Sequence, residues 1–144
     1  RISEAVHRLR ERTGAPRVAL VCHSMGGLAA RAWVRATGGE LAARVVTLGT
    51  PHRGTFHALL GLGESTRQMR VDSDWLRALA ASETPAVRER FTVILSHHDN
   101  IVAPQAIQTL EGATTVELGG LGHVTLVYDR DVWEAVEEAL SWAD

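Results

Sequence analysis

The chain has 144 residues and a formal net charge of -2, with 45% hydrophobic and 22% charged residues. This length and composition predict one soluble globular domain with a sizeable core. The net charge of -2, without any block of like charges, gives no support for binding to nucleic acid or an anionic membrane. The arginines are mostly scattered at helix-like intervals among acidic residues, which is more typical of a solvated face than of a binding patch. The apolar runs are too short to cross a bilayer, and the single cysteine excludes an intrachain disulfide.

The first predicted element is an amphipathic helix from Ile2 to Arg12, which ends at Gly14 and Pro16. The chain begins at Arg1 rather than Met, inside this helix. We therefore expect an N-terminally truncated piece of a longer protein, with any targeting signal on the other part. Both a cytoplasmic and a secreted location stay open, because many secreted proteins also lack disulfides.

Four short segments are predicted as strands, and the first of them is a continuous apolar run bounded by turn signals, which is typical of a strand buried in a parallel sheet. The four segments are Val18 to Val21, Arg44 to Leu48, Phe91 to Leu95 and Thr114 to Leu118. Helical patterns lie between or after these segments, from Met25 to Ala36, Asp74 to Ala81 and Asp129 to Trp142. Strands that alternate with helices predict an α/β fold, a mostly parallel sheet flanked by helices. We expect residues 1–144 to form a single domain.

The turn between the first strand and the following helix carries the most informative motif. Ser24 lies at its tip, with Cys22 and Gly26 on either side in the pattern C-x-S-x-G. Such a strand–turn–helix lifts a serine hydroxyl above the sheet, and small flanking residues let the strand and helix approach. The helix N-terminus then favours developing negative charge, so the backbone N–H of Met25 is the expected oxyanion donor. Cys22, where the pattern has glycine, is interpreted as a small packing residue, with a redox-active thiol as the alternative.

Two segments together resemble a known superfamily. The run CHSMGGLAAR, from Cys22 to Arg31, resembles the nucleophile elbow of bacterial lipases and esterases of the α/β-hydrolase superfamily. The run VTLGTPHRGT, from Val46 to Thr55, is similar to the T-L-G-x-P-H-x-G-T segment of its triacylglycerol-lipase-like members. The resemblance covers the whole chain and implies the C-terminal half of the α/β-hydrolase fold, in which the four predicted strands are the fifth to the eighth.

The same resemblance implies two consequences of the missing half. The second oxyanion donor normally comes from a loop that would precede this chain. The strand from Val18 to Val21, central in the family, would have an open edge, through which we expect pairing or self-association.

Asp99 is the predicted acid of a catalytic triad. It follows the strand from Phe91 to Leu95, and the chain order Ser, Asp, His is that of this fold. The segment S-x-x-D-x-I-V-x-P around Asp99 also resembles the family's acid loop. Asp72 and Asp74 are competitors, but they precede the strand and so lie out of order.

His123 is the predicted base. It ends a glycine-rich loop after the strand from Thr114 to Leu118, and the glycines would let that loop fold back over the serine turn. An imidazole in reach of a serine, with a carboxylate to orient it, is what activation of the serine requires.

The other histidines suggest no second site. His23 is interpreted as a residue that helps hold the turn, His52 and His57 lie in the loop after the second strand, and His97 and His98 flank the acid. Their spacing is not that of a zinc site, and no glycine-rich nucleotide loop is present, so no metal and no cofactor are expected.

The sequence therefore predicts a serine hydrolase that cleaves carboxylic esters, small or lipid, through an acyl-enzyme on Ser24. Thioesterase, acyltransferase and polyester depolymerase activities use the same triad and stay open. A non-catalytic binding protein or an inactive fragment is the alternative from a different class.

The segment from Thr55 to Leu79 is predicted to form a short cap or lid, at about residues 55–80. Apolar side chains in it would line an acyl pocket or pack in the ordinary way. They are Phe56, Leu59, Leu60, Leu62 and Trp75.

Overall fold

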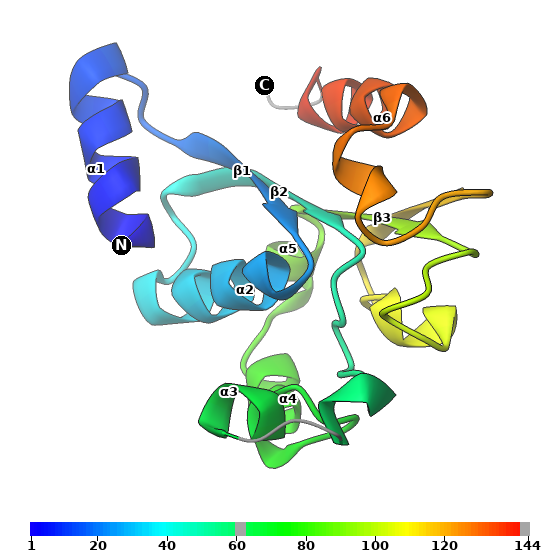
Figure 1. The fold of residues 1–144 in the computed structure, drawn as a ribbon. Helices are drawn as coiled ribbons and strands as arrows, with labels where there is room; N and C mark the ends of the chain where they lie inside the picture. Colours follow the sequence, from blue (N-terminus) through cyan, green and yellow to red (C-terminus); the bar gives the residue numbers. More distant parts are fainter. Residues whose placement is uncertain (60–62, 142–144) are drawn as a thin grey trace.

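The computed structural model describes residues 1–59 and 63–141, and it contains a four-stranded parallel sheet (Figure 1). The strands lie in the order β1-β2-β3-β4 and every neighbouring pair is parallel. Their bounds are Val18–His23 for β1, Ala42–Leu48 for β2, Phe91–Ser96 for β3 and Thr114–Leu118 for β4. The four predicted strands and their parallel arrangement are confirmed. Because all four strands run the same way, their C-terminal ends meet at one edge of the sheet.

Helices cover both faces of the sheet. Helices α1 (Ile2–Thr13) and α2 (Met25–Thr37) lie on one face, and α6 (Arg130–Ser141) lies on the other (Figure 1). Successive strand residues point to opposite faces. Val45 and Val93 accordingly pack with α1 and α2, whereas their neighbours Val46 and Ile94 pack with α6. Among the described residues, no helix is both long and apolar enough to cross a membrane.

The connection from β2 to β3 is built from short helices. These are η1 (Phe56–Leu59), α3 (Glu64–Gln68), α4 (Asp74–Ala81) and α5 (Pro85–Arg88). Two further single turns, η2 (Gln105–Gln108) and η3 (Thr125–Val127), follow β3 and β4. Only α4 was predicted, because its apolar residues recur at helical spacing. Its N-cap, Ser73, accepts a hydrogen bond from the N–H of Leu76 at 3.2 Å.

One arginine, Arg31, is buried in the fold, unlike the solvated arginines that the sequence pattern favours. Arg31 on α2 is only 1% exposed. Its guanidinium donates to both carboxylate oxygens of Glu83, at 2.7 and 2.8 Å. Arg31 is therefore an exception to the mostly solvated arginines, and it ties α2 to the chain after α4.

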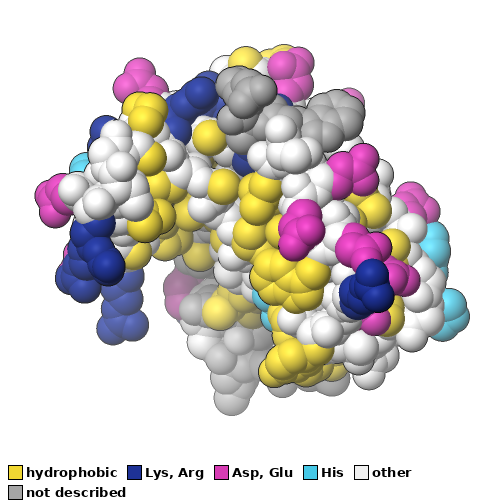
Figure 2. Space-filling view, turned by 90° about the horizontal axis from the view of Figure 1, so that it is seen from above, with side chains coloured by type: hydrophobic (Ala, Val, Ile, Leu, Met, Phe, Trp, Pro, Cys, Tyr) yellow, Lys and Arg dark blue, Asp and Glu magenta, His cyan; other side chains and the backbone are white. Residues whose placement is uncertain are grey.

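Strand β1 lies at one edge of the sheet and is only half covered. Its residues Val18, Leu20 and Cys22 pack toward α1 and α2, whereas Val21 on the other face is 39% exposed. Viewed from above, hydrophobic side chains are exposed in the middle of this face, between arginines on the α1 side and carboxylates on the α6 side (Figure 2). The edge position of β1 agrees with the expected open edge, and self-association through it stays a prediction.

Candidate active site

The chain turns sharply at Ser24, between the end of β1 and the start of α2. The backbone of Ser24 has φ 53°, a left-handed conformation that costs energy for a residue with a Cβ. The Ser24 N–H donates to the carbonyl of Leu48 at 2.8 Å, and the Ser24 carbonyl accepts from Thr50 Oγ1 at 2.8 Å. The end of β2 and the residues after it therefore hold the strained turn in place.

Small residues around Ser24 are needed for close packing. A Cβ added to Gly27 would lie 2.2 Å from Thr50 Oγ1, so that position accepts only glycine. A Cβ on Gly26 would lie 3.8 Å from the Cβ of Cys22, an ordinary contact. Cysteine therefore fits where the motif has glycine. Cys22 packs against the core, and burial raises the pKa of its thiol above 9.0, which favours the packing interpretation over thiolate chemistry.

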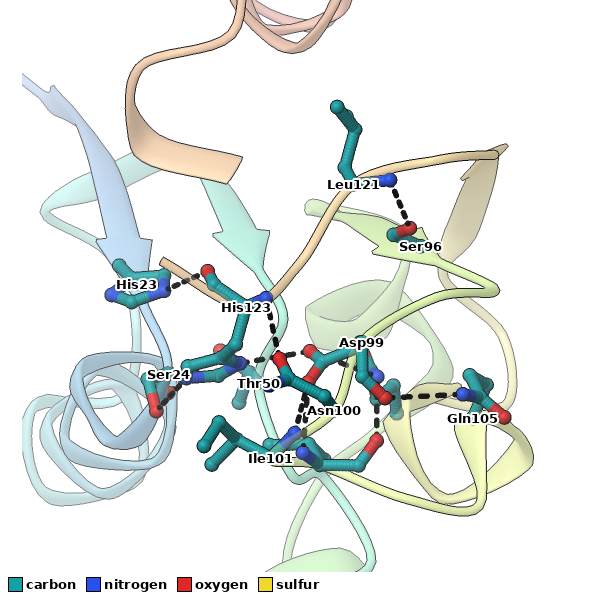
Figure 3. Close-up of polar contacts among 12 residues, drawn as sticks. His23, Ser24, Thr50, Ser96, Asp99, Asn100, Ile101, Gln105, Leu121 and His123 are labelled. Atoms are coloured by element: carbon teal, nitrogen blue, oxygen red, sulfur yellow. Dashed lines mark hydrogen bonds and ion pairs between the residues drawn. The ribbon is translucent and has the colours of Figure 1, made fainter. Parts of the chain in front are cut away.

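The structure brings Ser24, His123 and Asp99 together at the C-terminal edge of the sheet (Figure 3). His123 Nε2 lies 2.9 Å from Ser24 Oγ, and His123 Nδ1 lies 2.8 Å from Asp99 Oδ2. Asp99 is 2% exposed and His123 6% exposed. A single line of hydrogen bonds thus runs from a buried carboxylate through an imidazole to a half-buried hydroxyl.

The carboxylate of Asp99 accepts four hydrogen bonds. Its Oδ1 accepts from the N–H groups of Ile101 at 2.9 Å and Val102 at 2.8 Å, the pattern of an aspartate that closes its own turn. Its Oδ2 accepts from His123 and from the side-chain amide of Gln108 at 3.2 Å. Gln108 was not identified as a site residue from the sequence. The one feature that could have indicated it is its position as a polar residue next to the buried, apolar Ile107.

Four side chains hold the loop that carries His123. Three of them follow or end β3, and the fourth ends β1, so the loop is fixed from both sides (Figure 3). From the β3 side, His98 Nδ1 accepts from the N–H of Gly120 at 2.8 Å, and Ser96 Oγ accepts from the N–H of Leu121 at 3.3 Å. Asn100 Oδ1 accepts from the N–H of His123 at 3.3 Å. From the β1 side, His23 Nε2 donates to the His123 carbonyl at 3.0 Å. The His23 and His123 rings are tilted, with centroids 4.7 Å apart.

Gly49 lies directly against the bond between Asp99 and His123. Its backbone has φ 55°, and an added Cβ would lie 3.1 Å from Asp99 Oδ2 and 3.2 Å from His123 Nδ1. The same Cβ would lie 2.9 Å from Leu126 Cδ1. Glycine at this position therefore lets the end of β2 pack flat against the buried hydrogen bond.

The competing acids lie in a different place. Asp72 is exposed and pairs with Arg53 at 3.8 Å, and Asp74 at the start of α4 pairs with Arg77. The carboxylate that contacts the imidazole of His123 is that of Asp99.

His52 is buried but belongs to the packing of the fold. Its Nε2 lies 3.0 Å from Thr47 Oγ1, and its carbonyl accepts from Arg31 Nη1 at 2.9 Å. Burial, followed by the positive charge of Arg31, holds the pKa of His52 well below its usual 6.5. His97 pairs on the surface with Glu117 at 3.0 Å. Among the described residues, no three His, Cys, Asp or Glu side chains gather as a metal site would require.

An apolar cavity begins beside the serine turn. It has a volume of about 260 Å³ and is lined by Met25 and Leu28 of α2 together with Met69, which follows α3, and Trp75 of α4. Of the predicted pocket residues, Trp75 lines this cavity and Phe56 is 52% exposed. The side chains of His57 and Leu59, and residues 60–62, lie outside the described part of the structure.

One family model matches almost the whole chain. The model of the PGAP1-like alpha/beta domain matches residues 2–143. The chain belongs to this family. Triacylglycerol lipases from Pseudarthrobacter phenanthrenivorans and Burkholderia plantarii are both 48% identical to it, over 78% of this chain and 41% and 36% of their own lengths. The PGAP1-like domain described here thus spans about two fifths of these curated relatives.

Solved structures agree on the fold. The mature lipase BlEst2 from Bacillus licheniformis has a TM-score of 0.79 at 15% identity, covering 96% of this chain and 71% of the lipase. MGS-MChE2, an alpha/beta hydrolase from a lagoon-sediment metagenome, has a TM-score of 0.64 at 15% identity, with 96% and 67% covered. The α/β-hydrolase fold expected from the sequence is confirmed.

Proposed function

We propose that this chain cleaves carboxylic esters as a serine hydrolase, through an acyl-enzyme on Ser24. The observation that carries the proposal is the continuous contact from Asp99 Oδ2 to His123 Nδ1, at 2.8 Å, and from His123 Nε2 to Ser24 Oγ, at 2.9 Å. Nucleophile, base and orienting carboxylate then have the mutual geometry that acyl transfer requires.

The proposed reaction has two matched steps. Ser24 Oγ attacks the ester carbonyl carbon while its proton moves to His123 Nε2, and the tetrahedral intermediate collapses as His123 returns that proton to the leaving alcohol. Water then attacks the acyl-enzyme with the same base, and Ser24 is released together with the carboxylic acid. Asp99 Oδ2 accepts from the Nδ1–H of His123, so the lone pair of Nε2 faces the serine.

The oxyanion of each intermediate is assigned one donor from this chain. Met25 opens α2, and its N–H belongs to the first helical turn, where N–H groups have no acceptor within the helix and the dipole is positive. One oxyanion donor is worth on the order of a hundred- to a thousandfold in rate. The N–H of Met25 therefore makes a major contribution in the proposed mechanism.

The surroundings of Ser24 support an apolar acyl group. Met25, Ile101 and Val124, each next to or near a triad residue in the sequence, are 52%, 44% and 61% exposed. The 260 Å³ cavity is lined on one side by Met25 and on the other by Gln68 and Trp75 of the predicted cap segment. We assign the acyl chain to this cavity and the cap to the segment from η1 to α4.

The proposal is tested by turnover of p-nitrophenyl acetate, butyrate and octanoate, with matched thioesters beside them. We expect ester hydrolysis that Ser24→Ala abolishes and that the matched surface variant Ser141→Ala retains. Trp75→Ala should change the preference among chain lengths while acetate hydrolysis persists. Tight binding of an ester by the folded protein without any turnover would replace the proposal with the binding-protein alternative, and faster thioester cleavage would reassign the substrate class.

A further inference from the structure

Gln108 places a buried amide against the predicted catalytic acid. The residue is fully buried on η2, and its Nε2 lies 3.2 Å from Asp99 Oδ2 and 2.9 Å from the carbonyl oxygen of Val102. We propose that Gln108 is a positioning residue that tunes the proton affinity of His123 by neutralising part of the charge on Asp99 Oδ2. This inference rests on the proposed function and adds a residue that neither the motif nor the chain order indicated.

The orientation of the Gln108 amide is fixed by its neighbours. The NH2 group has two hydrogens, and it meets two acceptors, one a carboxylate and the other a main-chain carbonyl. A flipped amide would place Oε1 against both of these oxygens, where no hydrogen bond can form. Gln108 therefore donates to Asp99, and it does so only while Asp99 Oδ2 is an acceptor.

The carbonyl oxygen of the same amide is left without a hydrogen bond among the described residues. Within the described part of the chain, Gln108 Oε1 is buried and has no hydrogen-bond partner. A glutamine that served packing alone would satisfy its carbonyl oxygen or be replaced by an apolar residue, because an unpaired buried acceptor destabilises the fold. The gain lies at the donor end, where a hydrogen bond to a carboxylate is stronger than one between neutral groups.

The position of this donor determines the sign of its effect. Asp99 Oδ2 is the oxygen that faces His123 Nδ1, so the Gln108 N–H withdraws negative charge from the atom that stabilises a protonated imidazole. Without that N–H, Asp99 would attract the imidazolium more strongly and His123 would stay protonated to higher pH. His123 would then act as a base only at higher pH than in the wild type.

Two other titratable groups face the loop of His123. His23, at the end of β1, contacts the His123 carbonyl and ring, and His98, after β3, accepts from Gly120. Both are unchanged in the variants below, so their titration is common to every profile and cancels in the comparison.

The chain offers a matched control on the same short helix. Gln105 Nε2 donates to the main-chain carbonyl of Asp99 at 3.2 Å, not to its carboxylate. Gln105→Met and Gln108→Met therefore each remove a side-chain amide that donates to Asp99. Only the second change acts on the oxygen that faces His123. Gln108→Glu places a second carboxyl there and enlarges the negative potential.

The experiment measures the second-order rate of phosphonylation of Ser24 by a fluorophosphonate as a function of pH. For Gln108→Met we expect the inflection to move up by about one pH unit, with a larger upward shift for Gln108→Glu and none for Gln105→Met. An unshifted inflection in both Gln108 variants would overturn the proposal. Loss of folding in both, with Gln105→Met folded, would also overturn it by assigning Gln108 a purely structural role.

A second readout separates this inference from the proposed function. If folded wild-type protein is not phosphonylated at any pH, the serine-hydrolase proposal fails by itself. The deshielded proton of the His123 Nδ1–H···Asp99 bond, followed by proton NMR, then decides the role of Gln108. A resonance that moves in Gln108→Met and stays in place in Gln105→Met supports the tuning role, and equal behaviour of the two variants contradicts it.

Discussion

Two clusters of buried charged side chains in this molecule differ in what they can do. The triad cluster consists of Ser24, Asp99 and His123, and the arginine cluster consists of Arg31, Glu83 and Arg88. Both bury a carboxylate almost completely, with Asp99 2% exposed and the Glu83 side chain 2% exposed. Burial of a charge is therefore not what distinguishes the candidate site.

The arginine cluster is closed and cannot exchange protons. Glu83 accepts from Arg31 at 2.7 and 2.8 Å and from Arg88 at 3.3 Å. Arg88 also donates to the Ala80 carbonyl at 2.9 Å. Guanidinium groups stay protonated at all accessible pH, so this cluster is a fixed tie between α2 and the end of α4. It supports the walls of the site without acid–base chemistry.

The triad cluster is open at one end. His123 is the member that can gain and lose a proton, and its Nε2 faces a hydroxyl on a strained, half-buried turn. Buried charge as such does not distinguish the candidate site. What distinguishes it is that the titratable His123 lies between the carboxylate of Asp99 and the hydroxyl of Ser24.

The largest expected effect is a loss of ester hydrolysis when the carboxylate of Asp99, but not that of Glu83, is replaced by an amide. Asp99→Asn should lower ester hydrolysis by on the order of 10⁴-fold, because an amide nitrogen facing His123 Nδ1 selects the wrong tautomer. Steady-state turnover, with circular dichroism to verify folding, measures this. Glu83→Gln is the matched control, expected to keep turnover per folded molecule within about threefold. An Asp99→Asn protein within tenfold of the wild type would remove Asp99 from the proposed triad.

Arg31→Met should affect stability instead of chemistry. We expect a loss of about 3–5 kcal/mol in the free energy of unfolding, because the variant leaves the Glu83 carboxylate buried without its main partner. The double variant Arg31→Met/Glu83→Met should recover most of that loss. Urea unfolding of the two proteins gives the comparison, and a double variant no more stable than the single one would contradict the structural role of the pair.

Gly49→Ala tests how closely β2 packs on the triad cluster. We expect about tenfold slower phosphonylation of Ser24, since the new methyl group would force Asp99 and His123 apart. Gly14→Ala is the matched control, with φ 71° and no atom within 4 Å of an added Cβ. Both variants bear a similar backbone cost, so equal phosphonylation rates would exclude the contact with the Asp99–His123 bond as a determinant of activity.

The smallest expected effect concerns His52, whose carbonyl accepts a hydrogen bond from Arg31 of the arginine cluster. Its pKa lies well below 6.5 in the folded chain, so the unfolded chain binds a proton first as the pH falls. Its contribution to stability is present above about pH 6.5 and decreases below it, by up to about 1.4 kcal/mol per pH unit. Urea unfolding at pH 7 and pH 5 should therefore show a steeper loss for the wild type than for His52→Gln. Parallel losses would contradict the buried, neutral state of His52.

The sequence predicted the parts of the molecule that depend on local patterns. The four strands and the long helices follow from apolar periodicity, and the order Ser24, Asp99, His123 follows from the strand ends. The short elements η1, α3, α5, η2 and η3 carry no period, so they were missed. The burial of Arg31 was not predicted, because its partner Glu83 lies far along the chain. Gln108 was missed because a tertiary contact with Asp99 determines its role.

The most direct test of the central claim is the intact mass of the folded protein after treatment with a fluorophosphonate. Attack by Ser24 forms the serine–phosphorus bond, and fluoride leaves. We predict a single adduct on the wild type and on Ser141→Ala, and none on Ser24→Ala. No adduct on folded wild-type protein, or an adduct that persists in Ser24→Ala, would contradict the assignment of Ser24 as the activated nucleophile.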